Sequence, residues 1–173
     1  MRETIAAACL AVLPFGTAIA ETIGTVTAAF DGGEARTFYA NVVDGQSRSS
    51  WLSIMPGALT GASFSIWANP AAEANAMSDV LVLGASLVRA PNGYRAIAEA
   101  QYLESGFDRF WTAAEENAVQ IELSGIEVDG DTLVVEGSFT APLTYAEGAS
   151  APVLDPERQT VITGTFSARL PKD

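Results

Sequence analysis

Turn-forming residues divide most of this sequence into runs of roughly ten residues, which limits what the chain can form. Between the turns, Val, Ile, Thr and aromatic residues alternate with polar ones, as in strands that bury one face. The turns are rich in Asp, Gly, Asn and Pro, and lie at residues 31–33, 44–47, 56–57, 91–93 and 129–131. We predict an all-β fold, an antiparallel β-sandwich or partly closed β-barrel meander of about 8–9 strands. The expected strands are residues 22–30, 36–43, 51–55, 62–68, 80–88, 94–103, 119–128, 132–141 and 159–170.

Two segments near the C-terminus share one pattern. Residues 134–143 and 161–170 both contain a β-branched pair, then Gly, Ser or Thr, Phe, Ser or Thr, Ala and finally Leu. We predict that they are neighbouring antiparallel strands with Phe139 and Phe166 in one core. The shared glycines are expected at bulges or under a bulky side chain of the next strand. Residues 24–30 form a looser third copy.

Other segments are less regular. We expect any helix to be confined to residues 69–79 or 104–117, and residues 69–79 are equally consistent with a loop. Residues 94–103 fit a strand, although their Ala and Glu content also allows a helix. A long loop is predicted over residues 142–156, where Pro, Gly and Ser accumulate.

The first twenty residues have the pattern of a secretory signal peptide. Arg2 precedes an apolar run, and residues 18–20 are Ala-Ile-Ala, the small–large–small pattern that signal peptidase accepts. The uninterrupted apolar run, residues 5–13, is too short to span a bilayer as a helix. The alternative to a cleaved signal peptide is therefore an uncleaved anchor that lies in the membrane interface. We predict cleavage after Ala20, a periplasmic or secreted location, and a single β domain over residues 21–173. Cys9 would be removed with the leader.

Composition excludes several chemistries. The sequence has no histidine, its one cysteine lies in the leader, and its only lysine is Lys172. Catalytic triads, thiol chemistry and the usual histidine-containing zinc and copper sites are therefore excluded, and we expect no cofactor. The formal net charge of −12 repels phosphate backbones, so nucleic acid is not expected as a partner. We expect no membrane span after signal cleavage; the oligomeric state stays undetermined.

An enzyme built from this chain would depend chiefly on carboxylates. Adjacent or nearby pairs are Glu115 with Glu116, Glu99 with Glu104, and Asp108 beside Arg109. Glycosidases hold two carboxyl groups across a sugar cleft, with apolar surroundings raising the pKa of one. Glu104 and Asp108 are the best placed, because aromatic residues surround them. The alternative is that these carboxylates are simply solvated.

The acidic turn at residues 129–131 resembles part of a calcium loop. Calcium takes oxygen ligands from carboxylates and carbonyls. However, an apolar run begins at Leu133, where further ligands would be needed. We therefore predict a hairpin turn and no metal site.

Aromatic residues provide the candidate binding site. Trp51 and Trp67 share a strand parity with serines, which indicates a polar face where an exposed indole would stack on a ligand. The alternative is that both faces of these strands are buried. Residues 107–111 are unusually aromatic for a connection, although such a segment often plugs the end of a barrel. The predicted site residues are Trp51, Trp67, Phe107, Asp108, Arg109, Phe110 and Trp111.

Three functions are consistent with the sequence. The first is a non-catalytic exported domain that binds a small apolar or carbohydrate ligand, or a protein partner; a deep apolar cavity would favour it. The second is an envelope or adhesion module, which a long unpaired strand edge would favour. The third is a carboxylate-based hydrolase, which two carboxylates facing each other across a cleft would favour.

Overall fold

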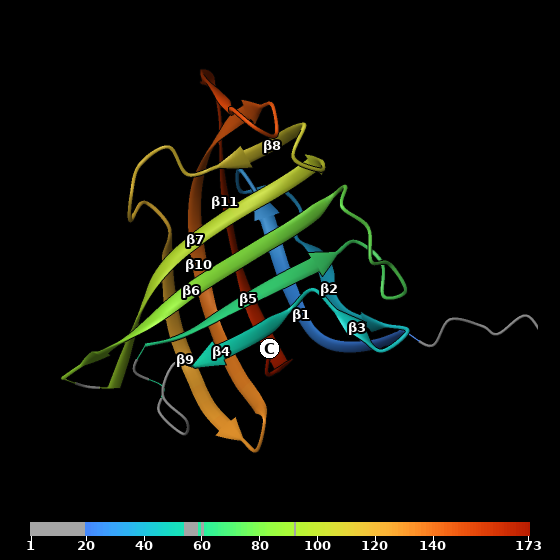
Figure 1. Ribbon diagram of the computed structural model, residues 1–173. Coiled ribbons are helices and arrows are strands. Elements are labelled where there is room, and N and C mark those ends of the chain that lie inside the picture. The colour runs from blue at the N-terminus through green and yellow to red at the C-terminus, as the bar shows by residue number, and fades with distance from the viewer. Residues whose placement is uncertain (1–19, 54–58, 60, 92) are drawn as a thin grey trace, which may run out of the picture.

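The computed structural model describes residues 20–53, 59, 61–91 and 93–173, which form eleven strands and no helix (Figure 1). Every strand pair among these residues is antiparallel, so the predicted all-β antiparallel fold is confirmed. The predicted leader up to Ile19, with Cys9, and the predicted turn at residues 56–57 lie outside the described residues. The strands are β1 (Ala20–Phe30), β2 (Arg36–Val43), β3 (Gln46–Ser47), β4 (Ser50–Ser53), β5 (Ala62–Asn69), β6 (Val80–Ala90), β7 (Gly93–Ser105), β8 (Arg109–Thr112), β9 (Gln120–Asp129), β10 (Thr132–Glu147) and β11 (Val153–Pro171).

Hydrogen-bonded strands form a closed ring. The order is β3-β2-β1-β11-β10-β8-β7-β6-β5-β4, and β2 also pairs with β5 through Tyr39↔Asn69 and Ala40↔Ala68. In Figure 1, β4 to β7 cross the front of the ring, and β10 and β11 pass behind them. Strand β9 lies outside this path and pairs with the first half of β10, while β8 pairs with its second half.

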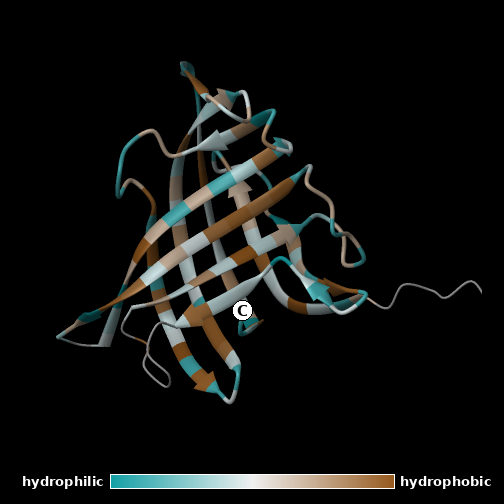
Figure 2. Cartoon of the chain, viewed as in Figure 1, coloured by the Kyte–Doolittle hydropathy of each residue, from teal (hydrophilic) through white to brown (hydrophobic). Residues whose placement is uncertain are grey.

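Alternation along the strands places the main core inside the ring. On β5, Phe64, Ile66 and Ala68 are buried, whereas Ser65 and Trp67 between them are partly exposed. Figure 2 shows hydrophobic and hydrophilic residues alternating along β7. Burial of apolar surface at about 25 cal/mol per Å² drives this arrangement.

The turns form where the sequence predicts them. Strands β1 and β2 are joined at Asp31 and Gly32, whose φ angles are 49° and 70°. Gly130, with φ 62°, joins β9 to β10. Glycine adopts positive φ without the steric cost that a Cβ imposes, which explains its place in these turns.

The two similar C-terminal segments are neighbouring strands, as predicted. Within the β10–β11 pair, Gly137 lies opposite Phe166, and Phe139 lies opposite Gly164. Both phenylalanines are buried in the main core. Gly137 also lies at a register shift between β9 and β10, so both predicted roles of the shared glycine occur together.

The predicted loop over residues 142–156 is wrong. Strand β10 continues to Glu147 and β11 begins at Val153, which leaves only residues 148–152 as the connection. Pairing with both β11 and β8 holds the end of β10 in the sheet. The register shifts after Thr144, whose partner is Gln159, to Tyr145, whose partner is Asp155, so Pro156 lies in a bulge where its missing N–H is tolerated.

Neither segment that the sequence left open to helix forms one. Residues 70–79 are turns and loop, and residues 104–117 contain the end of β7, the short strand β8 and turns. Residues 94–103 lie in β7, which confirms the predicted strand. No helix long and apolar enough to cross a bilayer occurs in the described part of the chain.

Candidate functional site

Strand alternation divides the aromatic segment 107–111 between the two faces of the sheet. On β8, Phe110 pairs with Leu103 and Trp111 pairs with Tyr102. Phe110 packs with Val80 and Leu103 in a small cluster, whereas Trp111 packs against the main core inside the ring. Asp108 and Arg109, at the start of β8, are exposed. The five residues therefore do not form one surface.

Trp51 belongs to the core. Its side chain is only 3% exposed, and its indole Nε1 donates a hydrogen bond to the carbonyl oxygen of Asp131 at 3.1 Å. The backbone N–H of Asp173 donates to the carbonyl oxygen of Trp51 at 2.9 Å. Trp51 therefore faces the core, so the predicted exposed indole is wrong for this residue; the other face of β4 carries Leu52, which is 44% exposed. The hydrogen bonds of Trp51 tie β4 to the C-terminus.

Trp111 belongs to an aromatic cluster on the paired strands β8 and β10. Its ring meets that of Tyr145 edge to face, with centroids 5.3 Å apart. The guanidinium of Arg158 lies 3.3 Å from the centroid of Tyr145 and 5.4 Å from that of Trp111. These three side chains thus join β8, β10 and β11.

Tyr102, the cross-strand partner of Trp111, carries a hydroxyl that is hydrogen-bonded to a carboxylate. The Tyr102 hydroxyl donates a hydrogen bond to Asp79 Oδ1, and its ring packs edge to face on Phe30 with centroids 4.9 Å apart. Burial raises the pKa of Tyr102 above its usual value; the hydrogen bond to Asp79 adds to this effect, and Arg36 opposes it.

Three of the predicted site residues meet on the outer face of the ring. Phe107, 40% exposed, packs edge to face on Trp67 and on Phe110, with centroid separations of 6.4 and 6.2 Å. The guanidinium of Arg48 lies 6.0 Å from the Trp67 ring centroid, and its Nε donates to Asn75 Oδ1 in the loop after β5. Trp67 is therefore partly exposed and held in place from two sides.

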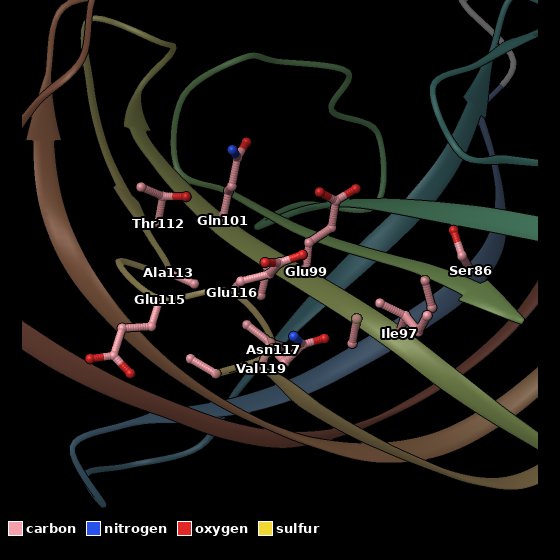
Figure 3. A pocket seen from close by; sticks show the side chains of 14 residues that line it. Ser86, Ile97, Glu99, Gln101, Thr112, Ala113, Glu115, Glu116, Asn117 and Val119 are labelled. Carbon is pink, nitrogen blue, oxygen red and sulfur yellow. The ribbon is translucent and has the colours of Figure 1, made fainter. Parts of the chain in front are cut away.

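Three adjoining hollows line this outer face, and we call them together the outer groove. Their volumes are about 350, 230 and 200 Å³, and Glu99 on β7 lines all of them. In Figure 3, Glu99 and Gln101 project from β7, and the segment after β8 carries Glu115, Glu116 and Asn117. The side chains that give the outer groove its chemistry are Ser65, Trp67, Ser86, Glu99, Gln101, Thr112, Glu115, Glu116 and Asn117.

Gly84 leaves the space that Glu99 occupies at the centre of the outer groove. The two residues are cross-strand partners on β6 and β7. A Cβ on Gly84 would lie 2.8 Å from Glu99 Oε1 and 2.9 Å from its Cγ. The glutamate side chain therefore lies flat on the sheet, over a residue without a side chain.

The structure groups the carboxylates differently from the sequence. Glu99 shares a hollow with Glu115 and Glu116, whereas Glu104 and Asp108 do not line it. Sequence spacing missed this grouping, because it depends on the pairing of Thr112 with Gln101, which leads the chain after β8 back along β7. Within the described part of the chain, no three acidic residues are placed to hold a metal ion.

The acidic turn at residues 129–131 is a hairpin turn, as predicted. The Asp129 carboxylate forms an ion pair with Arg169 at 3.1 Å. The carbonyl oxygen of Asp131 accepts hydrogen bonds from the Trp51 indole and from the backbone N–H of Lys172. The Asp129 carboxylate and the Asp131 carbonyl therefore hold the hairpin turn against β4 and β11.

Strand β9 carries an edge that makes no strand pairing among the described residues, since its one ladder is with β10. Glu122 and Glu127 are exposed on this strand. Charged side chains on an edge strand oppose pairing with another chain. The edge therefore gives little support to an envelope or adhesion module.

Comparison with known proteins gives no relative from which a function can be transferred. No family model matches the chain, and neither curated proteins nor solved structures match it significantly. Its function must therefore be inferred from the geometry of the outer groove.

Proposed function

We propose that this protein is a non-catalytic domain that binds a carbohydrate in the outer groove. One observation carries the proposal: the indole of Trp67, the carboxylate of Glu99, the amide of Gln101 and the hydroxyl of Ser65 line the same hollow. This hollow therefore combines an aromatic surface with three kinds of hydrogen-bonding group: a carboxylate, an amide and a hydroxyl.

Sugars require this combination. The C–H face of a pyranose ring packs on an aromatic ring, and its hydroxyls need donors and acceptors at the rim. A carboxylate accepts hydrogen bonds from two neighbouring hydroxyls, while an amide both donates and accepts. Glu99 and Gln101 lie two residues apart on β7, so alternation directs both side chains to the same face.

The size of the outer groove also suits a short oligosaccharide. Its largest hollow, about 350 Å³, falls within the usual range of ligand sites, and the two smaller hollows extend it along the sheet. The hollows share Glu99, so a linear chain of sugar units bound along them would pass this residue.

Calorimetric titration with soluble oligosaccharides tests the proposal. We expect Trp67→Ala to weaken the affinity for a binding sugar about tenfold or more, because an aromatic contact at the centre of a site is lost. Glu99→Gln should weaken it by about the same factor. Glu104→Gln and Val153→Ala, exposed residues outside the outer groove, are the matched controls and should have no effect. Binding that survives Trp67→Ala would contradict the proposal.

A second candidate is a carboxylate-based hydrolase, because Glu99, Glu115 and Glu116 line one hollow. Such an enzyme would use one glutamate as acid and another as base or nucleophile. Incubation of bound oligosaccharides with wild type, Glu99→Gln and Glu104→Gln distinguishes the candidates. Shorter products from wild type and Glu104→Gln, but not from Glu99→Gln, would establish hydrolysis. Oligosaccharides that stay unchanged with wild type would exclude it.

We also propose the finer features that the sequence predicts. The ring of strands supports a partly closed barrel over a sandwich, because only two residue pairs join β2 to β5. The pattern of residues 1–20 supports export to the periplasm or the medium, where extracellular carbohydrate would be met. N-terminal sequencing of the protein from its host tests export: the expected first residue is Glu21, and Met1 would contradict it.

A further inference from the structure

We propose that the carbohydrate bound in the outer groove carries free amines, as an oligomer of glucosamine does. This inference rests on the proposed function and specifies, in addition, that the bound carbohydrate is positively charged. The outer groove and its indole define the site, and the charges that line it select among sugars.

All the charged side chains that line the outer groove are acidic. Glu115 and Glu116 stand on one wall, Glu99 lies at the centre, and neither arginine nor lysine lines any of its three hollows. None of the three glutamates forms an ion pair within the described part of the chain. Unbalanced charges of one sign in a hollow raise the local concentration of ligands of the opposite sign.

The position of Glu99 adds a geometric reason. Its side chain lies over Gly84, where a Cβ would come within 2.8 Å of the carboxylate oxygen Oε1. The missing side chain at Gly84 thus lets Glu99 lie along the sheet, where it lines the same hollow as Trp67 and Gln101. An ammonium group at this point would form a charge-assisted hydrogen bond, stronger than that of a hydroxyl.

The same argument disfavours other sugars. A neutral hydroxyl in place of the ammonium keeps the contact with Trp67 but loses the charge-assisted bond. An N-acetyl group removes the charge and adds bulk beside Glu99. Acidic sugars would be repelled by three uncompensated carboxylates.

The experiment uses the protein purified from its host. Calorimetric titration compares its binding of three β-1,4-linked tetramers, those of glucosamine, N-acetylglucosamine and glucose. We expect the glucosamine tetramer to bind about tenfold more tightly than the glucose tetramer at low salt. About 0.5 M salt should reduce this advantage, because the carboxylates are exposed. Glu99→Gln and a Glu115→Gln/Glu116→Gln double variant should each reduce it, and Glu104→Gln should leave it unchanged.

Each outcome separates this inference from the proposed function. If the glucose or N-acetylglucosamine tetramer binds as tightly as the glucosamine tetramer, the inference is wrong and carbohydrate binding stands. If no tetramer or other oligosaccharide binds, both are wrong. If the glucosamine tetramer binds equally to wild type, Trp67→Ala and both glutamine variants, it responds only to the overall charge of −12, and the inference is wrong.

Discussion

The ring of Phe166 lies over Gly137 on the neighbouring strand, and its Cζ is 2.9 Å from the position that a Cβ on Gly137 would take. Phe139 and Gly164 repeat this relationship in the opposite direction, with Cε1 of Phe139 2.8 Å from the added Cβ. Each strand thus places a phenylalanine ring over a glycine of the other strand. This reciprocal packing explains why residues 134–143 and 161–170 share their sequence pattern.

We expect Gly137→Ala to destabilise the protein by about 1–3 kcal/mol or more, because the methyl group would meet both Phe166 and the carbonyl oxygen of Glu122. Urea denaturation followed by circular dichroism measures the change. Gly125→Ala is the matched control, since its Cβ would lie 3.7 Å from the nearest atom, in the side chain of Glu136. A similar loss in both variants would show that strand glycine itself, not the ring above it, determines the cost.

The strands and their turns follow from local sequence. Alternation fixes the faces of β5 and β11, and Asp-Gly turns join β1 to β2, β2 to β3 and β9 to β10. The end of β10 was missed, because residues 142–147 lack clear alternation and are held by pairing on both edges. Local pattern carries no information on such distant partners.

The outer groove depends on contacts that no local pattern shows. Trp67 and Phe107 were predicted as site residues and do meet, yet Trp51 and Trp111 have the same chemistry and serve the core. The sequence singled out Glu99 only as a possible partner of Glu104, since its place in the outer groove depends on its pairing with Gly84. Residue type indicated the kind of site, whereas the strand order determined which residues form it.

Gly84→Ala should weaken ligand binding while the fold is retained. The added methyl group would meet the flexible end of Glu99 and no backbone atom within 3.3 Å, so the glutamate moves and the sheet does not. We expect the loss of affinity to match that of Glu99→Gln, about tenfold, with a change in stability within about 1 kcal/mol. In the Gly84→Ala/Glu99→Gln double variant the two losses should not add. Fully additive losses would show that Gly84 does not act through Glu99.

Trp51 and Trp67 should respond oppositely to substitution. Trp51 also lines one hollow of the outer groove, but its side chain is buried in the core. Trp51→Phe removes the buried indole donor to the Asp131 carbonyl, so we expect destabilisation of about 1–3 kcal/mol and a smaller loss of affinity than in Trp67→Ala. Trp67→Ala, on the outer face, should chiefly lower affinity. Urea denaturation and calorimetric titration of both variants test this division. A loss of affinity in folded Trp51→Phe as large as that in Trp67→Ala would contradict this division.

Stability should fall in alkaline solution through Tyr102. Burial, with the hydrogen bond to Asp79, raises the pKa of its hydroxyl above the usual 10.0. As pH rises past 10.0, the unfolded state releases this proton while the folded state retains it, so the free energy of unfolding decreases. The contribution is fully present below the unfolded pKa and is lost as pH rises through the folded pKa. Tyr102→Phe should lessen the decrease when the urea midpoint is followed from about pH 8 to about pH 11. The same decrease in wild type and Tyr102→Phe would assign it to other groups.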